Sequence, residues 1–259
     1  NERTANAILQ DPNASGIGTD YSMSPRSLLS TTITDAWRMH QGPQAKIYAI
    51  GLLPQATIIM AGHAANACCW LDAAKQQWVT TSFYSEGLPA AADKMNISGR
   101  INTLAEREWT PRMDITMYNH PTDQEKKRGF TYLTKDNLLH SPAANTLVIE
   151  LALAQQEAQK LGSDIYPDLL LLQLNTLSPK AESDAIESAE QEDMYMGINQ
   201  DLGFLMEQLN KRIGKDKYQI LVVGRPIKGY STTTLEMANL PIQRFNSDRA
   251  AALIGTYLM

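Results

Sequence analysis

The sequence has few of the side chains that most often build metal and nucleophilic sites. It contains four histidines and two cysteines in 259 residues, and the histidines are scattered without the spacing of metal ligands. It has no P-loop, no G-x-G-x-x-G, no G-x-S-x-G elbow and no H-E-x-x-H motif. The local motifs therefore identify no chemistry of their own.

Long apolar runs and an excess of basic residues are missing as well. Apolar runs such as Leu169 to Leu172 are far shorter than the roughly 20 residues that span a bilayer. The first 18 residues are polar and lack the apolar core of a signal peptide, as in a mature or trimmed chain. The formal net charge is −5, so no global basic field favours nucleic acid or anionic lipid. We expect neither a membrane span nor a nucleic-acid partner.

The two cysteines are neighbours, Cys68 and Cys69. A disulfide between adjacent residues is strained. Two buried thiols are therefore expected, and the pair indicates little about the compartment.

What the sequence does have is enough apolar material for a substantial core, with hydrophobic residues at 43%. Short apolar runs bounded by turn residues alternate with helical patterns, which predicts a mostly parallel sheet covered on both faces. Strands are expected at 45–52, 56–61, 167–174 and 218–223, with a hairpin at 70–83. Helices are expected from Ser24, over 88–95, from Pro142 to Lys160, over 185–212 and from Asn246.

Residues 99–139 show no regular periodicity and predict an irregular cap or insert. The stretch contains aromatic and methionine residues of the kind enriched at protein interfaces: Trp109, Met113, Met117, Tyr118, Phe130 and Tyr132. Two interpretations stay open, a contact surface for a partner and a cap packed on its own domain.

Several longer segments carry a family resemblance. They are S-P-R-S-L-L-S-T-T-I-T-D-A-W-R from Ser24, A-G-H-A-A-N-A-C-C-W-L-D from Ala61, W-V-T-T-S-F-Y from Trp78, E-D-M-Y-M-G-I-N-Q-D-L-G from Glu192 and K-R-I-G-K-D-K-Y from Lys211. In order and spacing they resemble the bacterial secreted alkaline phosphatases of the alkaline phosphatase/nucleotide pyrophosphatase superfamily. The most similar branch is the one with a threonine nucleophile found in Bacteroidetes.

The resemblance implies a doubly wound α/β sandwich, taken as one domain over residues 1–259 with the insert at 99–139. In working members two zinc ions activate a threonine that attacks a phosphate ester. It also implies that parts of the family fold are missing here. The nucleophile and the first aspartate ligand belong before residue 1, and the last histidine ligand belongs beyond Met259.

This sequence departs from the family at the working positions. The positions of four zinc ligands hold Ser178, Glu182, Arg225 and Pro226, and those of the phosphate-binding lysine and arginine hold Leu53 and Gln55. Of the four ligand positions only Glu182 could bind a metal, whereas Arg225 would place a permanent cation where zinc should sit. The resemblance with these losses predicts a pseudo-phosphatase with no catalytic residue and no cofactor.

The same comparison predicts where the altered residues lie. The carboxyl ends of parallel strands meet at one edge of a sheet. We therefore expect Ser178, Glu182, Arg225 and Pro226 to cluster there, near Leu53 and Gln55. One further candidate for a catalytic residue is His63, which we expect instead to be a hydrogen-bonded core histidine.

Three functions remain open on this evidence. The first is an inactive binding or scaffold module with an unknown protein partner in the bacterial envelope, periplasmic or otherwise secreted as the family is. The second is a metal-dependent phosphomonoesterase or phosphodiesterase whose missing site residues lie outside this chain. The third is a protein that binds a small anion through Arg225, with support from Lys228.

Overall fold

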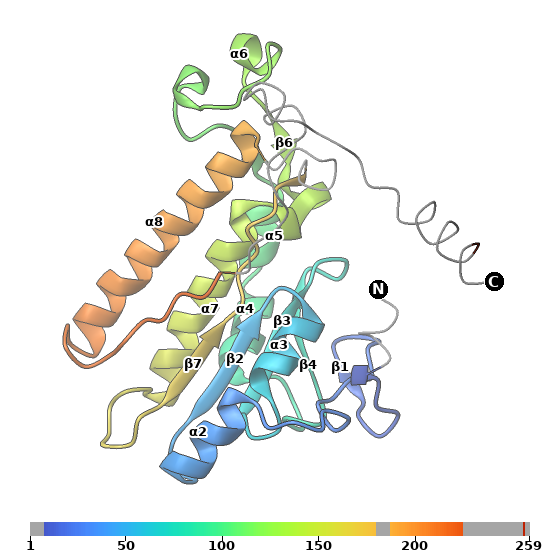
Figure 1. The fold of residues 1–259 in the computed structure, drawn as a ribbon, viewed down its shortest axis with the longest axis vertical. Helices are drawn as coiled ribbons and strands as arrows, with labels where there is room; N and C mark the ends of the chain where they lie inside the picture. Colours follow the sequence, from blue (N-terminus) through green and yellow to red (C-terminus); the bar gives the residue numbers. More distant parts are fainter. Residues whose placement is uncertain (1–7, 180–186, 225–255, 257–259) are drawn as a thin grey trace.

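The computed structural model describes residues 8–179, 187–224 and 256, and shows an α/β fold (Figure 1). Its main sheet has five strands in the order β1-β4-β3-β2-β7. The strands are β1 (Gly16–Ile17), β2 (Ile47–Gly51), β3 (Ala67–Asp72), β4 (Gln77–Thr81) and β7 (Leu169–Leu172), with β5 (Glu108–Trp109) and β6 (Tyr132–Leu133) as a separate pair. The helices are α2 (Ile33–Gln41), α3 (Pro54–Ala61), α4 (Ala90–Ile97), α5 (Arg100–Ala105), α6 (Glu125–Arg128), α7 (Pro142–Gln159) and α8 (Ala189–Arg212).

The centre of the sheet is parallel. Strand β2 lies between β3 and β7 and is parallel to both, with Ile50 opposite Cys69 on one side and Leu172 on the other. Strand β4 returns antiparallel to β3, as the predicted hairpin requires. The carboxyl ends of β2, β3 and β7 therefore point to the same edge.

Helices cover both faces of the sheet, which confirms the predicted fold class. On one face Ile58 of α3 packs with Ala49 and Cys68, and on the other Leu147 of α7 packs with Ile50 and Cys69. Because successive strand residues point to opposite faces, the two neighbouring cysteines enter different cores. Both are free and buried, as expected, and burial raises the pKa of Cys69 to about 12.

Two predicted elements are wrong. Residues 56–61 form helix α3 and not a strand, because Pro54 opens a helical turn and the short apolar run suits a buried helix as well as a strand. The first helix begins at Ile33 and not near Ser24. The side chain of Thr32 accepts a hydrogen bond from the Asp35 backbone, and the Asp35 carboxylate accepts one from the Thr32 backbone.

The predicted buried strand at 218–223 is also wrong. No strand forms there, and Ile220, Leu221, Val222 and Val223 are 41%, 83%, 71% and 82% exposed. The helix predicted from Asn246 lies outside the described residues. No helix in the described ranges combines the length and apolar character needed to cross a bilayer.

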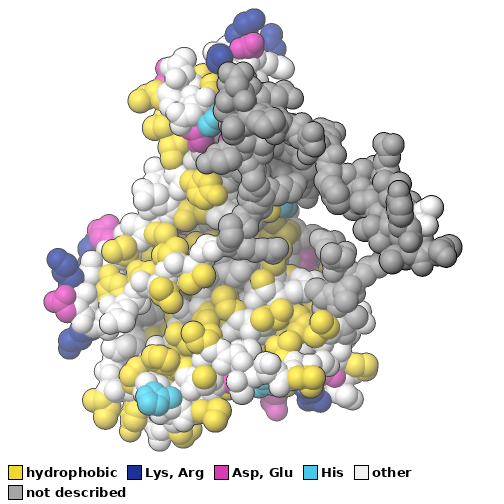
Figure 2. All heavy atoms as spheres, in the orientation of Figure 1, with side chains coloured by type: hydrophobic (Ala, Val, Ile, Leu, Met, Phe, Trp, Pro, Cys, Tyr) yellow, Lys and Arg dark blue, Asp and Glu magenta, His cyan; other side chains and the backbone are white. Residues whose placement is uncertain are grey.

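The insert at 99–139 is built from short elements, α5, α6, the β5-β6 pair and two 3₁₀ turns (Ile115–Met117 and Thr134–His140). It sits at one end of the molecule beside the start of α8 (Figure 1). Basic side chains gather at its tip, where α6 carries Lys126, Lys127 and Arg128 (Figure 2). Aromatic residues hold it together from inside, with Trp109 packed edge-on against Phe130.

Candidate functional site

The carboxyl edge of the sheet is where the family resemblance places the working residues, and three of them lie in connections that follow this edge. Their clustering with one another stays a prediction. Leu53 directly precedes α3 after β2, Gln55 lies in the first turn of α3, and Ser178 follows β7. Because β2 and β7 are parallel neighbours, the two connections leave the sheet at the same edge.

Glu182, Arg225, Pro226 and Lys228 lie outside the described residues. Their predicted place at the edge stays a prediction.

Gln173 joins the two connections. Its side-chain oxygen accepts hydrogen bonds from the backbone N–H groups of Leu52 at 2.7 Å and Leu53 at 2.9 Å. Gly51 makes room for this contact, because a Cβ there would lie 2.1 Å from Thr57 Oγ1 and 2.9 Å from Gln173 Cβ. The backbone donors at the end of β2 are therefore already occupied by a neutral amide of the chain itself.

A second pair of amides fixes the chain after β7 to helix α7. Asn145 donates from Nδ2 to the Asn175 carbonyl at 2.8 Å, and the Asn175 backbone N–H donates back to Asn145 Oδ1 at 2.9 Å. Asn175 also donates to the Leu139 carbonyl and accepts from the Leu177 backbone. Both asparagines are buried. Their polar groups are satisfied by one another and by the local backbone.

Ser178 is held by helix α8. Its backbone N–H donates to Gln191 Oε1 at 3.1 Å, and Gln191 also donates to the Thr176 carbonyl. The Ser178 side chain is fully buried, and its Oγ has no hydrogen-bond partner. Ser188 caps α8 by accepting from the Gln191 backbone, so the helix start and this part of the edge form one unit.

The described side chains that bind the backbone at this edge, Gln173, Asn145, Asn175 and Gln191, are uncharged, as is Ser178. The buried polar side chains there are three carboxamides and a hydroxyl, and His140 contacts the Leu177 carbonyl through Nδ1 at 3.2 Å. Within the described ranges no group of three or more His, Cys, Asp or Glu could hold a metal ion. The described side chains therefore do not fit a zinc site, which needs three or four anionic or imidazole ligands.

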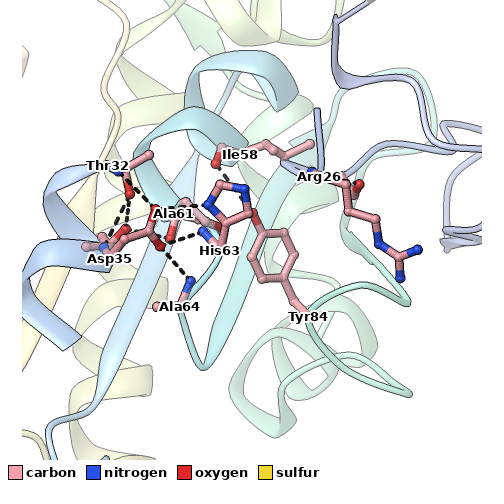
Figure 3. A network of polar contacts seen from close by, with 11 residues as sticks. Arg26, Thr32, Asp35, Ile58, Ala61, His63, Ala64 and Tyr84 are labelled. Atoms are coloured by element: carbon pink, nitrogen blue, oxygen red, sulfur yellow. Dashed lines mark hydrogen bonds and ion pairs between the residues drawn. The ribbon is translucent and has the colours of Figure 1, made fainter. Parts of the chain in front are cut away.

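His63 lies at the opposite, amino edge of the sheet, where it takes part in a network around Asp35 (Figure 3). The Asp35 carboxylate accepts hydrogen bonds from the backbone of Thr32, His63 and Ala64, and contacts His63 Nδ1 at 3.0 Å. Burial raises the pKa of Asp35, but these hydrogen bonds lower it to about 2. The His63 ring is hydrogen-bonded as expected, but the prediction of a core histidine is wrong, because its side chain is 37% exposed.

Sequence reasoning missed a buried carboxylate, Asp193 on α8, that anchors the insert. It accepts hydrogen bonds from Trp109 Nε1 at 2.7 Å, Tyr118 OH at 2.6 Å and the Arg112 backbone at 3.0 Å. Arg112 Nε adds an ion pair at 3.3 Å. Trp109 and Tyr118 are therefore buried against α8, so these aromatics are cap core and not a partner surface. The only sequence signal was an acidic residue inside a helix beside an aromatic-rich insert.

Comparison with known proteins supplies the context for this edge. The chain is 27% identical to a calcium-transporting ATPase of Myroides odoratus over 82% of its length, and 27% identical to alkaline phosphatase PhoV of Synechococcus elongatus over 77%. It is 25% identical to alkaline phosphatase PafA of Elizabethkingia meningoseptica over 87%. It spans 43%, 40% and 44% of those relatives. No protein-family model matches.

The crystal structure of wild-type PafA superposes on 82% of this chain with a TM-score of 0.72 at 24% identity, and the match covers 45% of PafA. A PafA variant with four substitutions gives a TM-score of 0.71. This likeness shows that the two proteins share a fold.

These relatives correct one expectation. The chain was expected to take no cofactor, but two of its relatives are alkaline phosphatases, a class of enzyme for which the family resemblance implies zinc ions. The prediction failed because it took the loss of ligands at a few transferred positions as a property of the whole protein. The sequence relatives and the shared fold together support placing this chain in the alkaline phosphatase superfamily.

Proposed function

We propose that this chain is an alkaline-phosphatase-like binding module that does not hydrolyse phosphate esters. The observation that supports the proposal is the uncharged carboxyl edge, where Leu53 and Gln55 follow β2 and a buried Ser178 follows β7. The proposal concerns catalysis and not the metal content of the protein.

The physical argument rests on charge. A phosphate ester is an anion that gains further negative charge on its equatorial oxygens during transfer, and enzymes stabilise it with cations and free donors. Leu53 offers neither, Gln55 is neutral, and the backbone donors of Leu52 and Leu53 already bind Gln173. An incoming phosphate would lose water at this edge without gaining ion pairs.

We further propose that the module works in the bacterial envelope and binds a protein partner there. The support is the family resemblance. The fold keeps its layers, its insert and its helix caps while the edge lacks charge, as expected of a scaffold retained for its surface.

Two other functions are alternative outcomes of the experiments described below. A metal-dependent phosphomonoesterase or phosphodiesterase is favoured by the relatives, two of which are alkaline phosphatases. It requires that segments outside the described residues supply the ligands and the nucleophile. Binding of a small anion through Arg225 and Lys228 is the second, and it needs no reaction.

The test is hydrolysis of an aryl phosphate and of a bis-aryl phosphate by the purified protein, with and without added zinc. We expect turnover at the background rate in every case. Zinc-dependent turnover that disappears in Glu182→Ala, but persists in the surface control Glu207→Gln, would overturn the proposal in favour of the phosphoesterase.

Calorimetry with inorganic phosphate distinguishes binding of a small anion from the other two functions. Heat that is lost in Arg225→Ala, without any turnover, would identify an anion-binding protein. Absence of both heat and turnover is the result that the proposal predicts.

A further inference from the structure

The first turns of helix α8 contact two different parts of the molecule. Three of their carboxylates accept hydrogen bonds from the insert: Glu190 from the Tyr132 hydroxyl, Glu192 from the Asn119 backbone, and Asp193 from Trp109, Tyr118 and Arg112. Gln191, which lies among them in the sequence, binds the chain after β7 instead. Because successive residues of an α-helix point in different directions, the start of α8 joins the insert to the carboxyl edge of the sheet.

Asp193 makes the central contact with the insert. Its side chain is fully buried, and its described donors all come from the insert. Arg112 extends this contact along α8, because its Nη1 donates to Gln200 Oε1 at 2.8 Å. The guanidinium lies against Gly197, where a Cβ would be 2.9 Å from Nη2. A buried carboxylate that loses its donors is strongly unfavourable, so the start of α8 should change its position when the insert leaves.

The outer part of the insert, Trp109–Tyr132, has a small core of its own. Its aromatic residues pack with Ala189 and Met194 of α8, in a cluster separate from the cores on the two faces of the sheet. The two ends of the insert belong to a main core, through Leu104 and Leu138. A part of a protein with its own small core can open locally while the rest stays folded. The outer insert can therefore leave α8 without global unfolding.

The chain after β7, Asn175–Ser178, lies on the other side of this junction, and we name it the edge segment. Asn175 is fixed to helix α7, whereas Thr176 and Ser178 are held by Gln191 of α8. The Ser178 side chain is fully buried, and its Oγ has no partner among the described residues. The end of the edge segment therefore depends on the position of α8, although its beginning does not.

We propose that docking of the outer insert on α8 controls access to the edge segment at Ser178. In the docked state, which the structure shows, Asp193 holds the insert and Gln191 holds the edge segment. In the released state Asp193 loses its donors, the first turns of α8 loosen, and Gln191 no longer covers Ser178. The inference goes beyond the proposed binding function. It holds equally for a phosphoesterase, because it concerns access to the edge and not turnover.

The experiment measures maleimide labelling of Ser178→Cys in the full chain, alone and combined with Asp193→Asn. The native Cys68 and Cys69 are buried in the main cores, and their labelling, resolved by peptide mass, reports global opening. We expect Asp193→Asn to accelerate labelling at position 178 at least about tenfold and to leave both native cysteines unlabelled. Asp35→Asn, which removes a hydrogen-bonded carboxylate far from α8, should leave the rate at position 178 within about twofold.

Two results of this experiment would overturn the proposal. The first is an unchanged rate at position 178 in Asp193→Asn, which would show that the insert does not control access. The second is an acceleration shared by Cys68 and Cys69, or equally large in Asp35→Asn, which would show global destabilisation.

A milder pair of variants serves if Asp193→Asn does not fold. Trp109→Phe keeps an aromatic ring beside Phe130 and removes the Nε1 hydrogen bond to Asp193. The matched control is Trp78→Phe, which removes the Nε1 contact with Met95 Sδ in a main core. Labelling of Ser178→Cys should rise at least about threefold in the first variant and not in the second. Equal rates in the two variants would contradict the proposal.

The reverse direction gives an independent test, because coupling between two sites is reciprocal. Gln191→Met removes the two hydrogen bonds to the edge segment and none of those to the insert. Hydrogen exchange of the Arg112 backbone N–H, which binds Asp193 at 3.0 Å, should then accelerate at least about threefold. Exchange that stays unchanged overturns the proposal, whatever the labelling rate at position 178.

Discussion

The two edges of the same sheet differ in the side chains that bind their backbone polar groups. At the amino edge, charged side chains bind the backbone: Asp35 accepts from the N–H groups of His63 and Ala64, and Arg38 donates to the carbonyls of Pro43 and Ala64. At the carboxyl edge, where α/β folds usually place their chemistry, neutral amides bind one another and the backbone. Among the described residues, the charged side chains Asp35 and Arg38 therefore hold the scaffold together at the amino edge.

This difference predicts how each edge responds when a charged side chain is added or removed. Each Asp35 hydrogen bond is charge-assisted, and together these bonds keep the buried carboxylate ionised, as its lowered pKa indicates. The Ser178 environment offers only an amide oxygen to the backbone and nothing to the hydroxyl. A charged side chain introduced at the carboxyl edge should therefore lower the stability of the fold. Removal of a charged side chain from the amino edge should lower the stability as well.

The largest expected effect is that of Ser178→Asp, which puts an acid at a position where the family resemblance implies a zinc ligand. A buried carboxylate without a partner should lower the free energy of unfolding by about 3–5 kcal/mol at pH 7. Urea denaturation measures it, with Ser178→Asn as the uncharged control of similar size. The loss should shrink as the pH falls and the new carboxyl takes up a proton. Equal stability of the two variants at pH 7 would show that a cation or water reaches this edge.

Removal of charge from the amino edge comes next. Asp35→Asn should cost about 2 kcal/mol at pH 7, because one amide oxygen cannot replace the carboxylate oxygens that bind several N–H donors. The folded pKa of about 2 lies below the ordinary 3.8, so this stabilisation is present above pH 4 and is lost as the pH falls towards 2. Thermal unfolding against pH checks it. Asp123→Asn, on a side chain that is 93% exposed, serves as the control and should change nothing.

A third carboxylate, Asp201, lies away from both edges, between α7 and α8, where its hydrogen bonds come from Thr146. Burial raises its pKa to about 6. The stability linked to its proton is complete below pH 4 and is lost as the pH rises through 6. Asp201→Asn should therefore stabilise the fold by about 1 kcal/mol above pH 6, after allowance for partial exposure, and have no effect below pH 4. A stabilisation that does not depend on pH would contradict this assignment.

The smallest effect is expected for Ser178→Ala. Its hydroxyl has no partner among the described residues, so its removal should change the free energy of unfolding by less than about 0.5 kcal/mol, and a small gain is expected. Asn175→Ala, which breaks the buried amide pair, is the contrasting variant and should cost about 2 kcal/mol. A large loss in Ser178→Ala would show that the hydroxyl binds a group, such as an ordered water, that supports the edge.

Elements with strong local signals were predicted well. Helix α7 has Ser141-Pro142 at its start and Gly162 just beyond its end, and the structure places it at Pro142–Gln159. Residues 56–61 contain no such signal within the run itself, and a short apolar run fits a buried helix and a buried strand equally. Pro54, at the start of α3, was the available signal for this helix.

The candidate edge was predicted only in part. The parallel pairing of β2 and β7 means that the connections holding Leu53 and Ser178 leave the sheet at the same edge, because parallel neighbours end on the same side. The backbone polar groups at that edge are hydrogen-bonded by Gln173, Asn145 and Gln191, whose partners are distant in sequence. No local pattern distinguishes such amides from exposed ones.

The sequence by itself determined strands β2, β3, β4 and β7, helices α4, α7 and α8, the burial of Cys68 and Cys69, and the loss of charge at Leu53, Gln55 and Ser178. These follow from residue type and from periodicity over a few turns. Only the tertiary structure decided that Trp109 and Tyr118 are buried and that residues 220–223 are exposed and form no strand. The physical reason is that burial depends on contacts made across the fold, such as those of Trp109 and Tyr118 with Asp193 on α8.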